Sequence, residues 1–408
     1  MRHSVILPLG ALLAFACSNS PEATGSSSAA DTADGGAPIL SLSCPRRAVG
    51  VLPRTGTWTR TAIAVAEAWS RDGYNGTGTT ISLTASGEPR IAYYSSESVC
   101  FGTWGWDRSG ALFLAQPSAT APSTALWDKR SLACDSSGFY PSIATGGAGG
   151  LHLAFSAQRH DESVGRVFYK YWTGDASSWS QLVGGMPSFN GSSAITTDCN
   201  GVPLVLSNGK LLAPTKAAAG LRSTVFADPA GSAYLVRDAR GHLHAASDVM
   251  VTVGSSGHGE ARYAEYDGSA WTVADPTGGA GGHLLGFDIG PDNTPHVLYQ
   301  SATGTDTWLA VRGPAGWTSK QLRSGRFSGN VAFAIDGAGE PIAILDSQFA
   351  RLPSAATTWS TTFAVPGAQA TSLLIDGAGN LHASYMHIDA PYSNGTSPSQ
   401  VYYARFSP

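Results

Sequence analysis

The chain has 408 residues, nearly three times the roughly 150 residues of an average domain, so length allows several domains or one large repetitive one. Charged residues make up only 13 % and glycine accounts for 49 residues, a profile that favours many short strands joined by tight turns. The formal net charge is −4 and no basic block occurs, which argues against nucleic acid or anionic lipid as a partner.

The chain opens with a segment typical of an export signal. Arg2 is followed by a mainly apolar run from Val5 to Ala16. Such a run extends only about 18 Å as a helix, too short for the roughly 30 Å hydrocarbon core of a membrane. Residues 14–16 have the small-x-small form of ordinary signal cleavage, and together with Cys17 they resemble a bacterial lipobox. Residues 1–17 are therefore predicted to be a lipoprotein-type signal peptide with a lipidated Cys17.

The cysteine count agrees with lipidation. Five cysteines in an exported chain leave one unpaired, and assigning Cys17 to the lipid leaves an even set. The remaining cysteines are Cys44, Cys100, Cys134 and Cys199. Two disulfides are expected among them, with three connectivities open. Residues 18–45 are rich in Ser, Ala and Gly, which predicts a flexible tether.

The residue after the lipidated cysteine bears on location. By resemblance to lipoproteins, Ser18 suggests a lipid anchor in the outer membrane of a Gram-negative cell. In that case the membrane is contacted only through the anchor. A soluble secreted or periplasmic protein is the alternative, because the same residues also fit ordinary signal cleavage.

Seven segments of the remaining chain align without gaps around a shared turn. The turn residues are Gly87, Gly149, Gly201, Gly241, Asn293, Gly339 and Gly379. Their mean spacing of about 49 residues lies near the forty to fifty expected of a four-stranded propeller blade. Short runs rich in β-branched and aromatic residues flank each turn, which indicates hairpin strands.

Turn chemistry explains several repeated residues. In four copies an aspartate stands three residues before the glycine, where a short acceptor starts a type I turn and glycine takes positive φ. These aspartates are Asp198, Asp238, Asp336 and Asp376. In the fifth copy Asn293 replaces glycine, and Pro291 supplies a φ that the turn requires. We therefore interpret the repeated aspartates and turn residues as structural.

A tryptophan marks the outer strand of most repeats. It stands 22 residues before the turn residue in four copies and 20 residues before it in the last. The positions are Trp127, Trp179, Trp271, Trp317 and Trp359. Ala219 occupies the corresponding position before the fourth turn, which predicts a degenerate blade.

The two ends of the chain complement each other. After the seventh hairpin only one strand remains, from Gln400 to Phe406. The segment around Trp58 precedes the first hairpin and can pair with that strand, which closes the ring and removes exposed sheet edge. Residues 46–408 are therefore predicted to be a single all-β domain. It is a seven-bladed β-propeller of four-stranded blades, closed by an N-terminal strand in the last blade. A β-sandwich or a six-bladed ring is the alternative.

The repeat pattern resembles a known group of proteins. Residues 372–385, SLLIDGAGNLHASY, match it best, and the pattern is similar to the repeats of bacterial surface propellers related to sialidase and BNR-repeat proteins. This resemblance implies the fold rather than an activity. The sialidase Asp-box, S-x-D-x-G-x-x-W, does not occur, because residues 267–271 lack the spacer between aspartate and glycine. No sialidase catalytic residue is therefore transferred to this chain.

Four histidines share one repeat position. They are His152, His244, His296 and His382. Because the position recurs around the ring, we interpret it as structural, with a hydrogen bond to the neighbouring blade. His242 and His244 are too few to ligate zinc, so neither a metal nor a cofactor is predicted.

Residues that break the repeat are the candidates for function, because loops on a rigid scaffold carry binding sites. Connections between the second and third strands share one face of a propeller, and four of them are long. Their candidate ligand-binding residues are Trp104, Trp106, Asp107, Arg108, Arg159, His160, Asp161, Glu162, His258, Glu260, His387, Asp389 and Tyr392. Aromatic rings stack on sugar faces, and charged groups bond to sugar hydroxyls. Ordinary solvated loops are the alternative.

The sequence thus predicts a monomeric cell-envelope lipoprotein whose propeller is a non-catalytic binding module for a glycan or a surface protein. The alternative is a glycan-cleaving enzyme on the same face. It would be a hydrolase with two of the loop carboxylates, or a lyase that uses His160 or His258 with Tyr392. In a hydrolase the carboxyl groups would lie about 5 Å apart for retention, or about 6.5–9.5 Å apart for inversion.

Overall fold

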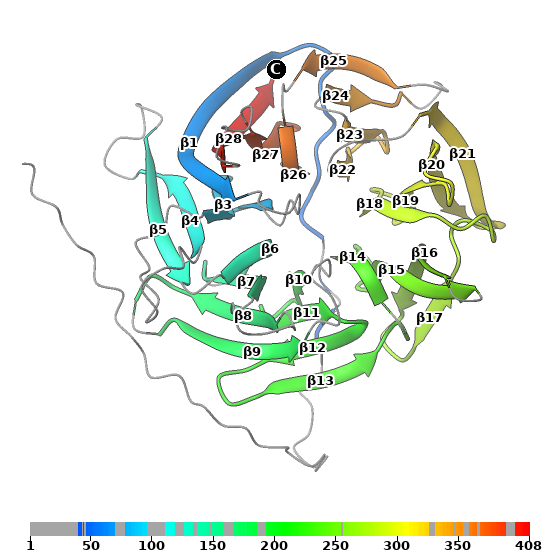
Figure 1. Ribbon diagram of the computed structural model, residues 1–408, viewed down its shortest axis with the longest axis horizontal. Coiled ribbons are helices and arrows are strands. Elements are labelled where there is room, and N and C mark those ends of the chain that lie inside the picture. The colour runs from blue at the N-terminus through cyan, green and yellow to red at the C-terminus, as the bar shows by residue number, and fades with distance from the viewer. Residues whose placement is uncertain are drawn as a thin grey trace, which may run out of the picture. The chain divides into compact units, whose positions relative to one another are not determined.

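The structure is a computed structural model. The structure describes residues 40–42, 44, 46–69, 78–95, 111–118, 126–133, 137–146, 149–157, 166–175, 177–185, 193–227, 229–253, 256–325, 331–345, 348–353, 359–364, 368–388 and 396–408. Within these ranges every regular element is a strand, and the strands form seven four-stranded antiparallel sheets around a centre (Figure 1). The predicted seven-bladed β-propeller is confirmed.

The first four blades follow the chain in order. Blade 1 contains β2 (Thr79–Leu83), β3 (Pro89–Ser95), β4 (Ala111–Pro117) and β5 (Trp127–Ala133). Blade 2 contains β6 (Ser137–Thr145), β7 (Leu151–Ala157), β8 (Arg166–Trp172) and β9 (Trp179–Gly185). Blade 3 contains β10 (Ala194–Thr197), β11 (Pro203–Ser207), β12 (Lys210–Pro214) and β13 (Ala219–Thr224). Blade 4 contains β14 (Pro229–Arg237), β15 (Leu243–Val253), β16 (Ser256–Tyr266) and β17 (Trp271–Ala274).

The last three blades complete the ring. Blade 5 contains β18 (His283–Ile289), β19 (Pro295–Gln300), β20 (Asp306–Gly313) and β21 (Gly316–Ser324). Blade 6 contains β22 (Ala332–Ile335), β23 (Pro341–Leu345), β24 (Gln348–Arg351) and β25 (Ser360–Ala364). Blade 7 contains β26 (Ala368–Ile375), β27 (Leu381–Ile388), β28 (Thr396–Ser407) and β1 (Thr57–Trp69). We call the face with the turns between first and second strands the turn face, and the opposite face the loop face.

The N-terminal strand closes the ring as predicted. β1 pairs with β28 in antiparallel register, with Trp58 opposite Phe406 and Thr61 opposite Tyr403. Through this pairing β28 is hydrogen-bonded on both edges and β1 on one. The pairing joins chain segments more than 300 residues apart. The Trp58 ring also reaches blade 6, where its centroid lies 5.1 Å from that of Phe349.

The repeated tryptophans lie at the start of the outer strands and pack between blades. Trp127 of blade 1 contacts Tyr403 of blade 7, and Trp317 of blade 5 contacts Tyr263 of blade 4, with ring centroids 5.3 and 5.1 Å apart. Aromatic pairs at these distances hold neighbouring blades together beyond simple area burial. Ala219 begins β13, so blade 3 has all four strands and lacks only the tryptophan. The prediction that this blade is degenerate was therefore wrong for its strands.

The turns between the first and second strands share one arrangement. In each of the four turns that contain the repeated aspartate, its Oδ1 accepts hydrogen bonds from the N–H groups two and four residues later, at 2.8–2.9 Å. The turn residues have positive φ, for example 84° at Gly87 and 65° at Asn293. Glycine and asparagine tolerate this conformation best, which is why they occupy the position.

The repeated histidines bond within their own blades. Nδ1 lies 2.6–2.7 Å from a tyrosine hydroxyl on the third strand of the same blade, in the pairs His152–Tyr169, His244–Tyr263 and His382–Tyr403. In blades 4 and 7 the other ring nitrogen faces the turn aspartate of that blade. The expected bond to a neighbouring blade was therefore wrong, because the tyrosine lies on the neighbouring strand of the same sheet, two register positions from the residue opposite the histidine. The histidines are structural, and they fix the second and third strands.

Residues 40–42, 44 and 46–56, which we call the strap, run along the turn face before the chain enters β1 (Figure 1). Ser41 N donates to Asp198 Oδ2 at 3.1 Å, and Leu52 N donates to Asp336 Oδ2 at 3.2 Å. The turn aspartates of blades 3 and 6 thus use one carboxylate oxygen for their own turn and the other for the strap. Gly50 N donates to Asp376 O in blade 7 at 2.8 Å.

A disulfide fixes the strap to blade 3. Cys44 is bonded to Cys199, which lies in the turn between β10 and β11. This decides one pairing that the sequence left open, whereas Cys100 and Cys134 lie outside the described residues. Leu42 and Leu52 of the strap are buried against the blades. Part of the segment that composition predicted to be a tether is therefore packed on the propeller.

Candidate functional site

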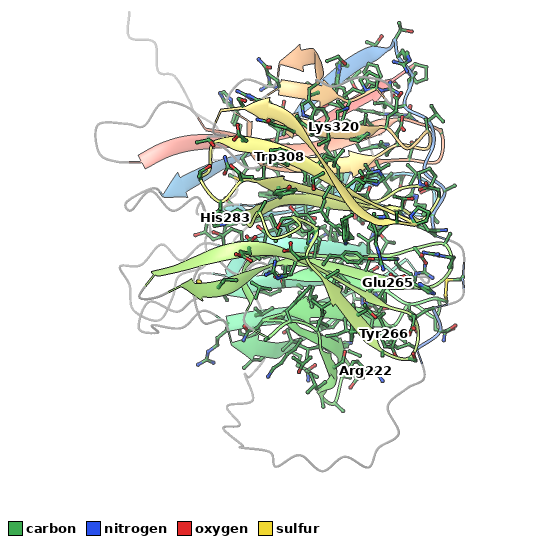
Figure 2. The ribbon with its side chains drawn as sticks, turned by 90° about the vertical axis from the view of Figure 1, so that its right-hand side faces the viewer. Arg222, Glu265, Tyr266, His283, Trp308 and Lys320 are labelled. Atoms are coloured by element: carbon green, nitrogen blue, oxygen red, sulfur yellow. A yellow bond between two sulfur atoms is a disulfide. The ribbon has the colours of Figure 1, made fainter. Side chains whose placement is uncertain are left out.

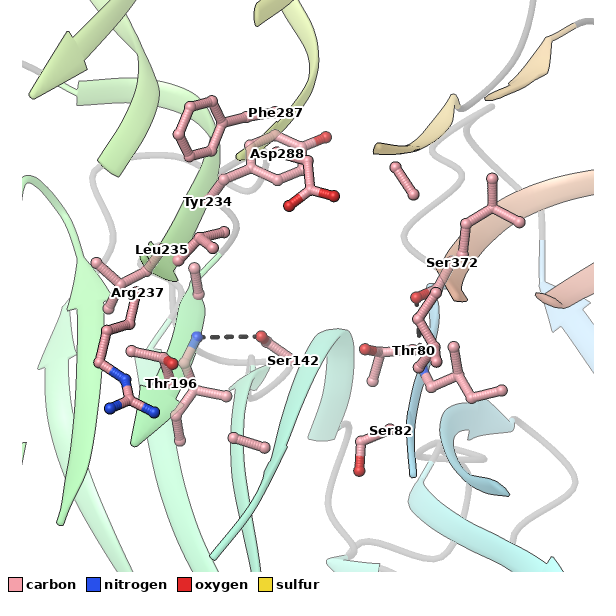
Figure 3. Close-up of a pocket in the computed structure, with 18 of the residues that line it drawn as sticks. Thr80, Ser82, Ser142, Thr196, Tyr234, Leu235, Arg237, Phe287, Asp288 and Ser372 are labelled. Atoms are coloured by element: carbon pink, nitrogen blue, oxygen red, sulfur yellow. Dashed lines mark hydrogen bonds between the residues drawn. The ribbon is translucent and has the colours of Figure 1, made fainter. Parts of the chain in front are cut away.

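The innermost strands surround a central cavity of about 1060 Å³, lined by residues from all seven blades and from the strap (Figure 3). Period-two alternation explains the lining. In β2, Ile81 and Leu83 are buried in the blade, while Thr80 and Ser82 lie half-exposed toward the centre. The cavity is large for a small-molecule site, for which volumes of about 300–1000 Å³ are usual.

One repeat position supplies a layer of hydroxyl groups to the cavity. Seven residues before the turn residue stand Thr80, Ser142, Tyr234 and Ser372, in blades 1, 2, 4 and 7. Figure 3 shows these side chains around the open centre. Ser142 Oγ accepts from Ile195 N at 3.1 Å, and Ser372 Oγ accepts from Ile81 N at 3.3 Å. Two of these hydroxyls therefore join one blade to the next.

The charged residues of the cavity lie at its turn-face end, which we call the floor. They are Arg46, Arg47, Asp198, Arg237 and Asp288. Arg46 forms an ion pair with Asp288 Oδ1 at 2.7 Å, while Asp288 Oδ2 accepts from Ile335 N at 2.9 Å. Because Cys44, Arg46 and Val49 of the strap line this end, the strap forms part of the floor.

Tyr140 lies at the loop-face end of the cavity, in a β-bulge of β6. Its φ of +48° is left-handed, a conformation that few bulky residues adopt. The bulge adjoins blade 1, where a Cβ added to Gly78 would lie only 3.2 Å from Pro141 Cδ. Burial raises the pKa of the Tyr140 hydroxyl above its usual value. Tyr140 thus lines the cavity from a strained segment held between two blades.

A buried carboxyl group connects blades 4 and 5 next to the same mouth. Asp248 on β15 is 7 % exposed, and its Oδ1 accepts from Leu284 N at 2.7 Å. Burial raises its pKa to about 6, against the opposing effects of the Leu284 N–H, the charge of His283 and the Ser232 N–H. Ser232 and Leu284 both line the cavity, so Asp248 fixes its wall without lining it.

His283 begins β18 beside this carboxyl group. A Cβ added to Gly259 would lie 3.1 Å from His283 Nδ1 and 3.5 Å from Asp248 Cβ, so the two side chains flank this glycine. Figure 2 shows His283 near the loop face and Glu265 toward the turn face. Sequence reasoning missed both Asp248 and His283, although Asp248 begins the long connection that contains the candidate residues His258 and Glu260.

The long connection expected in blade 4 is a hairpin rather than a loop. β15 and β16 pair up to Val253 and Ser256, with Val251 opposite His258. The placement of the His258 side chain lies outside the described part. Glu260 is on the same hairpin, where its Oε2 accepts from Arg262 at 2.7 Å, and Arg262 also pairs with Asp275. Val249, Val251, Thr252 and Val253 are β-branched, which favours a strand and explains why β15 continues this far.

The other predicted ligand-binding residues divide into two groups. His387 is half-buried on β27, near the ring of Tyr402. The remaining ones lie outside the described residues: Trp104, Trp106, Asp107, Arg108, Arg159, His160, Asp161, Glu162, Asp389 and Tyr392. The structure therefore brings Glu260 close to Arg262 and Asp275, and it leaves His387 three blades away on the ring.

No group of three or more His, Cys, Asp or Glu side chains in the described part of the chain is arranged to hold a metal ion. No helix there has the length and apolar character needed to cross a membrane.

Comparisons with known proteins give structural similarity alone. No family model and no curated protein matches the chain. The fold is similar to that of an α-L-arabinofuranosidase from Fusarium graminearum in complex with an iminosugar inhibitor, at 14 % identity over 85 % of this chain and 98 % of that one, with a TM-score of 0.47. It is similar to YCF48 bound to D1 peptide, at 12 % identity over 90 % and 99 %, with a TM-score of 0.49.

A sialidase is also among the similar structures. The NanB sialidase from Streptococcus pneumoniae shares 11 % identity over 84 % of this chain and 70 % of that one, with a TM-score of 0.43. At these identities the similarity is one of propeller architecture, and it assigns no ligand to this chain.

Proposed function

We propose that the protein is a non-catalytic binding module that acts as a monomer and takes a glycan or a surface protein at the loop face, into the central cavity. The observation that carries this proposal is the composition of the cavity wall. Its upper part consists of hydroxyl-bearing and apolar side chains from different blades, and its charged residues lie at the floor. Such a wall recognises a ligand by shape and hydrogen bonds.

The carboxylates of the floor support binding rather than catalysis. Asp288 is occupied by Arg46 and Ile335 N. Asp198 accepts from Asn200 N and Val202 N through Oδ1 and from Ser41 N through Oδ2. A general acid or base needs a carboxyl group within reach of the substrate and available to exchange a proton. These two groups are instead fully engaged in holding turns and the strap.

A binding experiment tests the proposal. Fluorescently labelled full-length protein is applied to an array of neutral glycans, acidic glycans and peptides. Thr80→Val then removes a cavity hydroxyl, and the control Ser86→Ala removes a hydroxyl from the exposed turn at the other end of the same hairpin. Loss of one hydrogen bond of about 0.5–1.5 kcal/mol predicts roughly two- to tenfold weaker binding for Thr80→Val alone. Weaker binding only for Ser86→Ala would contradict the proposal.

We further propose that Cys17 carries a lipid and that the protein is anchored in the outer membrane. The strap supports this arrangement, because residues 41 and 44 are bonded to the turn face. The loop face is the opposite side of the propeller. Mass analysis of the N-terminus from cells grown with and without globomycin tests the anchor. Diacylated Cys17 is expected, and an unmodified Cys17 would contradict it.

A further inference from the structure

We infer that the ligand of the cavity is the end of a neutral glycan chain, whose terminal sugar stacks on the ring of Tyr140 and bonds to the free hydroxyls below it. This inference rests on the proposed function and names the class of ligand. It depends on four observations in the cavity: a strained aromatic residue, a wall without charges in its loop-face half, inner strand edges that are partly hydrogen-bonded, and hydroxyl groups without a hydrogen-bond partner.

The first observation is the strain at Tyr140. A left-handed conformation costs a bulky residue of the order of a hydrogen bond, and it persists only where the surroundings impose it. The bulge of β6 between Phe139 and Ser142 imposes it here, and bulges commonly re-aim a side chain near a site. The Tyr140 side chain is half-buried, and its hydroxyl makes no hydrogen bond to another described residue. A strained segment therefore places an aromatic residue in the lining of the cavity.

The second observation is the absence of charge in this half of the described wall. Above the floor, the lining residues at the loop-face end include Thr79, Tyr140, Ser193 and Ser232. None of them is ionised at neutral pH, and burial raises the pKa of Tyr140 further. An acidic sugar or a charged peptide would lose its hydration here without a counter-charge, which is costly. A neutral polyhydroxylated ligand avoids this cost.

The third observation separates a glycan from an extended peptide. A peptide that binds along a sheet edge needs a row of free backbone N–H and C=O groups. Several innermost strands have these groups occupied by side chains of the preceding blade. The bonds run from Ile81 N to Ser372, from Ile195 N to Ser142, from Ile335 N to Asp288, and from the Tyr234 hydroxyl to Leu285 O. One backbone group on the inner edge of each of β2, β10, β18 and β22 is therefore already bonded, which interrupts the row of free groups that strand addition needs.

The fourth observation is a set of hydroxyl groups without partners. The buried Oγ of Ser193 has no hydrogen-bond partner among the described residues. The Thr80 hydroxyl likewise makes no hydrogen bond to a described residue, although the side chain lies beside those of Ser82 and Ser372, which are bonded (Figure 3). The hydroxyl of the half-exposed Thr80 can bond to a ligand directly, whereas the Ser193 Oγ is buried and can bond to a ligand only if the wall around it moves. Tyr140, Thr80 and Ser193 come from three consecutive blades around the mouth.

Titration calorimetry of the full-length protein in detergent tests the inference with four neutral tetrasaccharides, built of glucose, xylose, arabinose or N-acetylglucosamine, and with tetragalacturonate as the acidic counterpart. At least one neutral probe is expected to bind at least tenfold more tightly than tetragalacturonate. Tyr140→Gly should weaken that binding about tenfold or more. Tyr140→Phe keeps the ring and should cost less than Tyr140→Gly.

Thermal unfolding of the same variants separates a ligand contact from a structural role. Glycine relieves the left-handed strain, so Tyr140→Gly is expected to keep the melting temperature close to that of the unchanged protein while binding is lost. Thr80→Val should weaken binding without a change in melting temperature, because its hydroxyl has no partner to lose. A large fall in melting temperature for Tyr140→Gly with binding retained would overturn the inference.

The remaining outcomes distinguish this inference from the proposed function. Tight binding of tetragalacturonate or of a peptide that is weakened by Thr80→Val would overturn the neutral glycan and retain the cavity as the site. No binding of any of the five probes would overturn the inference, and the peptide spots of the array would then decide the proposed function. Binding that is insensitive to both Tyr140→Gly and Thr80→Val would overturn both.

Discussion

The Oδ1 atom of Asp248 lies 2.7 Å from the backbone nitrogen of Leu284, and this hydrogen bond joins the second strand of blade 4 to the first strand of blade 5. The groups that act on Asp248 are His283 on β18 and Ser232 on β14, and the charge of Asp248 in turn acts on Tyr234. On β16 the residue opposite Asp248 is Ala261, which stands between Glu260 and Arg262. Because burial raises the pKa of Asp248 to about 6, the bond between the blades is made by a carboxyl group that titrates in a mildly acidic medium.

The first prediction concerns the pH dependence that Asp248 confers. Its folded pKa of about 6 lies above the unfolded value, so its contribution to stability is fully present below about pH 4 and is lost as the pH rises through 6. Asp248→Asn cannot ionise and should remove this contribution, about 1–3 kcal/mol, from the difference in unfolding free energy between pH 4 and pH 7. Urea denaturation at several pH values measures it. The exposed Asp128→Asn is the control, and identical profiles for the unchanged protein and Asp248→Asn would contradict the prediction.

The second prediction has the opposite sign. Burial lowers the pKa of His152 to about 4, while its Nδ1 lies 2.7 Å from the Tyr169 hydroxyl. A histidine whose folded pKa is depressed stabilises the fold above its unfolded pKa of about 6.5, and this contribution is lost as the pH falls through 4. His152→Gln should therefore be less stable at pH 7. Between pH 7 and pH 4 its free energy of unfolding should fall by about 1–3 kcal/mol less than that of the unchanged protein. An equal acid loss in both proteins would refute this account of the histidine.

The third prediction concerns the strap. The Cys44–Cys199 bond spans 155 residues of chain, so opening it releases considerable freedom in the unfolded state. Cys44→Ser should lower the free energy of unfolding by about 2–5 kcal/mol, and Cys199→Ser should have the same effect. The double variant should be no less stable than either single one, because both remove the same bond. Guanidinium unfolding with and without reductant measures this, and midpoints that do not change would rule it out.

The fourth prediction concerns ring closure. Trp58 contacts Phe349 in blade 6 and Phe406 in its own blade, so it holds the closing strand on two sides. Trp58→Ala should cost about 2–4 kcal/mol, and Trp58→Phe should cost less because an aromatic contact remains. Denaturant unfolding gives the magnitude, and limited proteolysis should cut the Trp58→Ala variant first near β1. Unchanged stability of Trp58→Ala would show that closure depends on backbone pairing alone.

The ring itself was predictable because its signals repeat. Positive φ at Gly87 and its equivalents, the turn aspartates and the spacing of the tryptophans all follow from local chemistry that one chain shows several times. Ring closure was predictable for the same reason. Trp58 marks an outer strand that precedes the first hairpin and therefore has to pair with the last one. The His152 bond was misassigned because repetition shows that a residue is structural without showing its partner.

The strap and the mouth of the cavity could not be read in this way. Ser41 and Leu52 dock through backbone N–H groups, which no side-chain pattern reveals. Tyr140 precedes a proline, which ordinarily favours an extended conformation, and it is left-handed only because blades 1 and 2 meet at its bulge. Asp248 acquires its raised pKa from burial between two blades. Each feature depends on contacts between distant parts of the chain.

Hydrogen exchange of the full-length protein, measured with and without the tightest ligand found on the array, tests the central claim most directly. If the ligand enters the cavity from the loop face, it should slow exchange of amides at the loop-face ends of β2 and β6, including Thr80 and Tyr140. Exchange at Gly50 and Leu52 in the strap should stay unchanged. Protection of the strap and the turn face, with none at β2 and β6, would contradict the account.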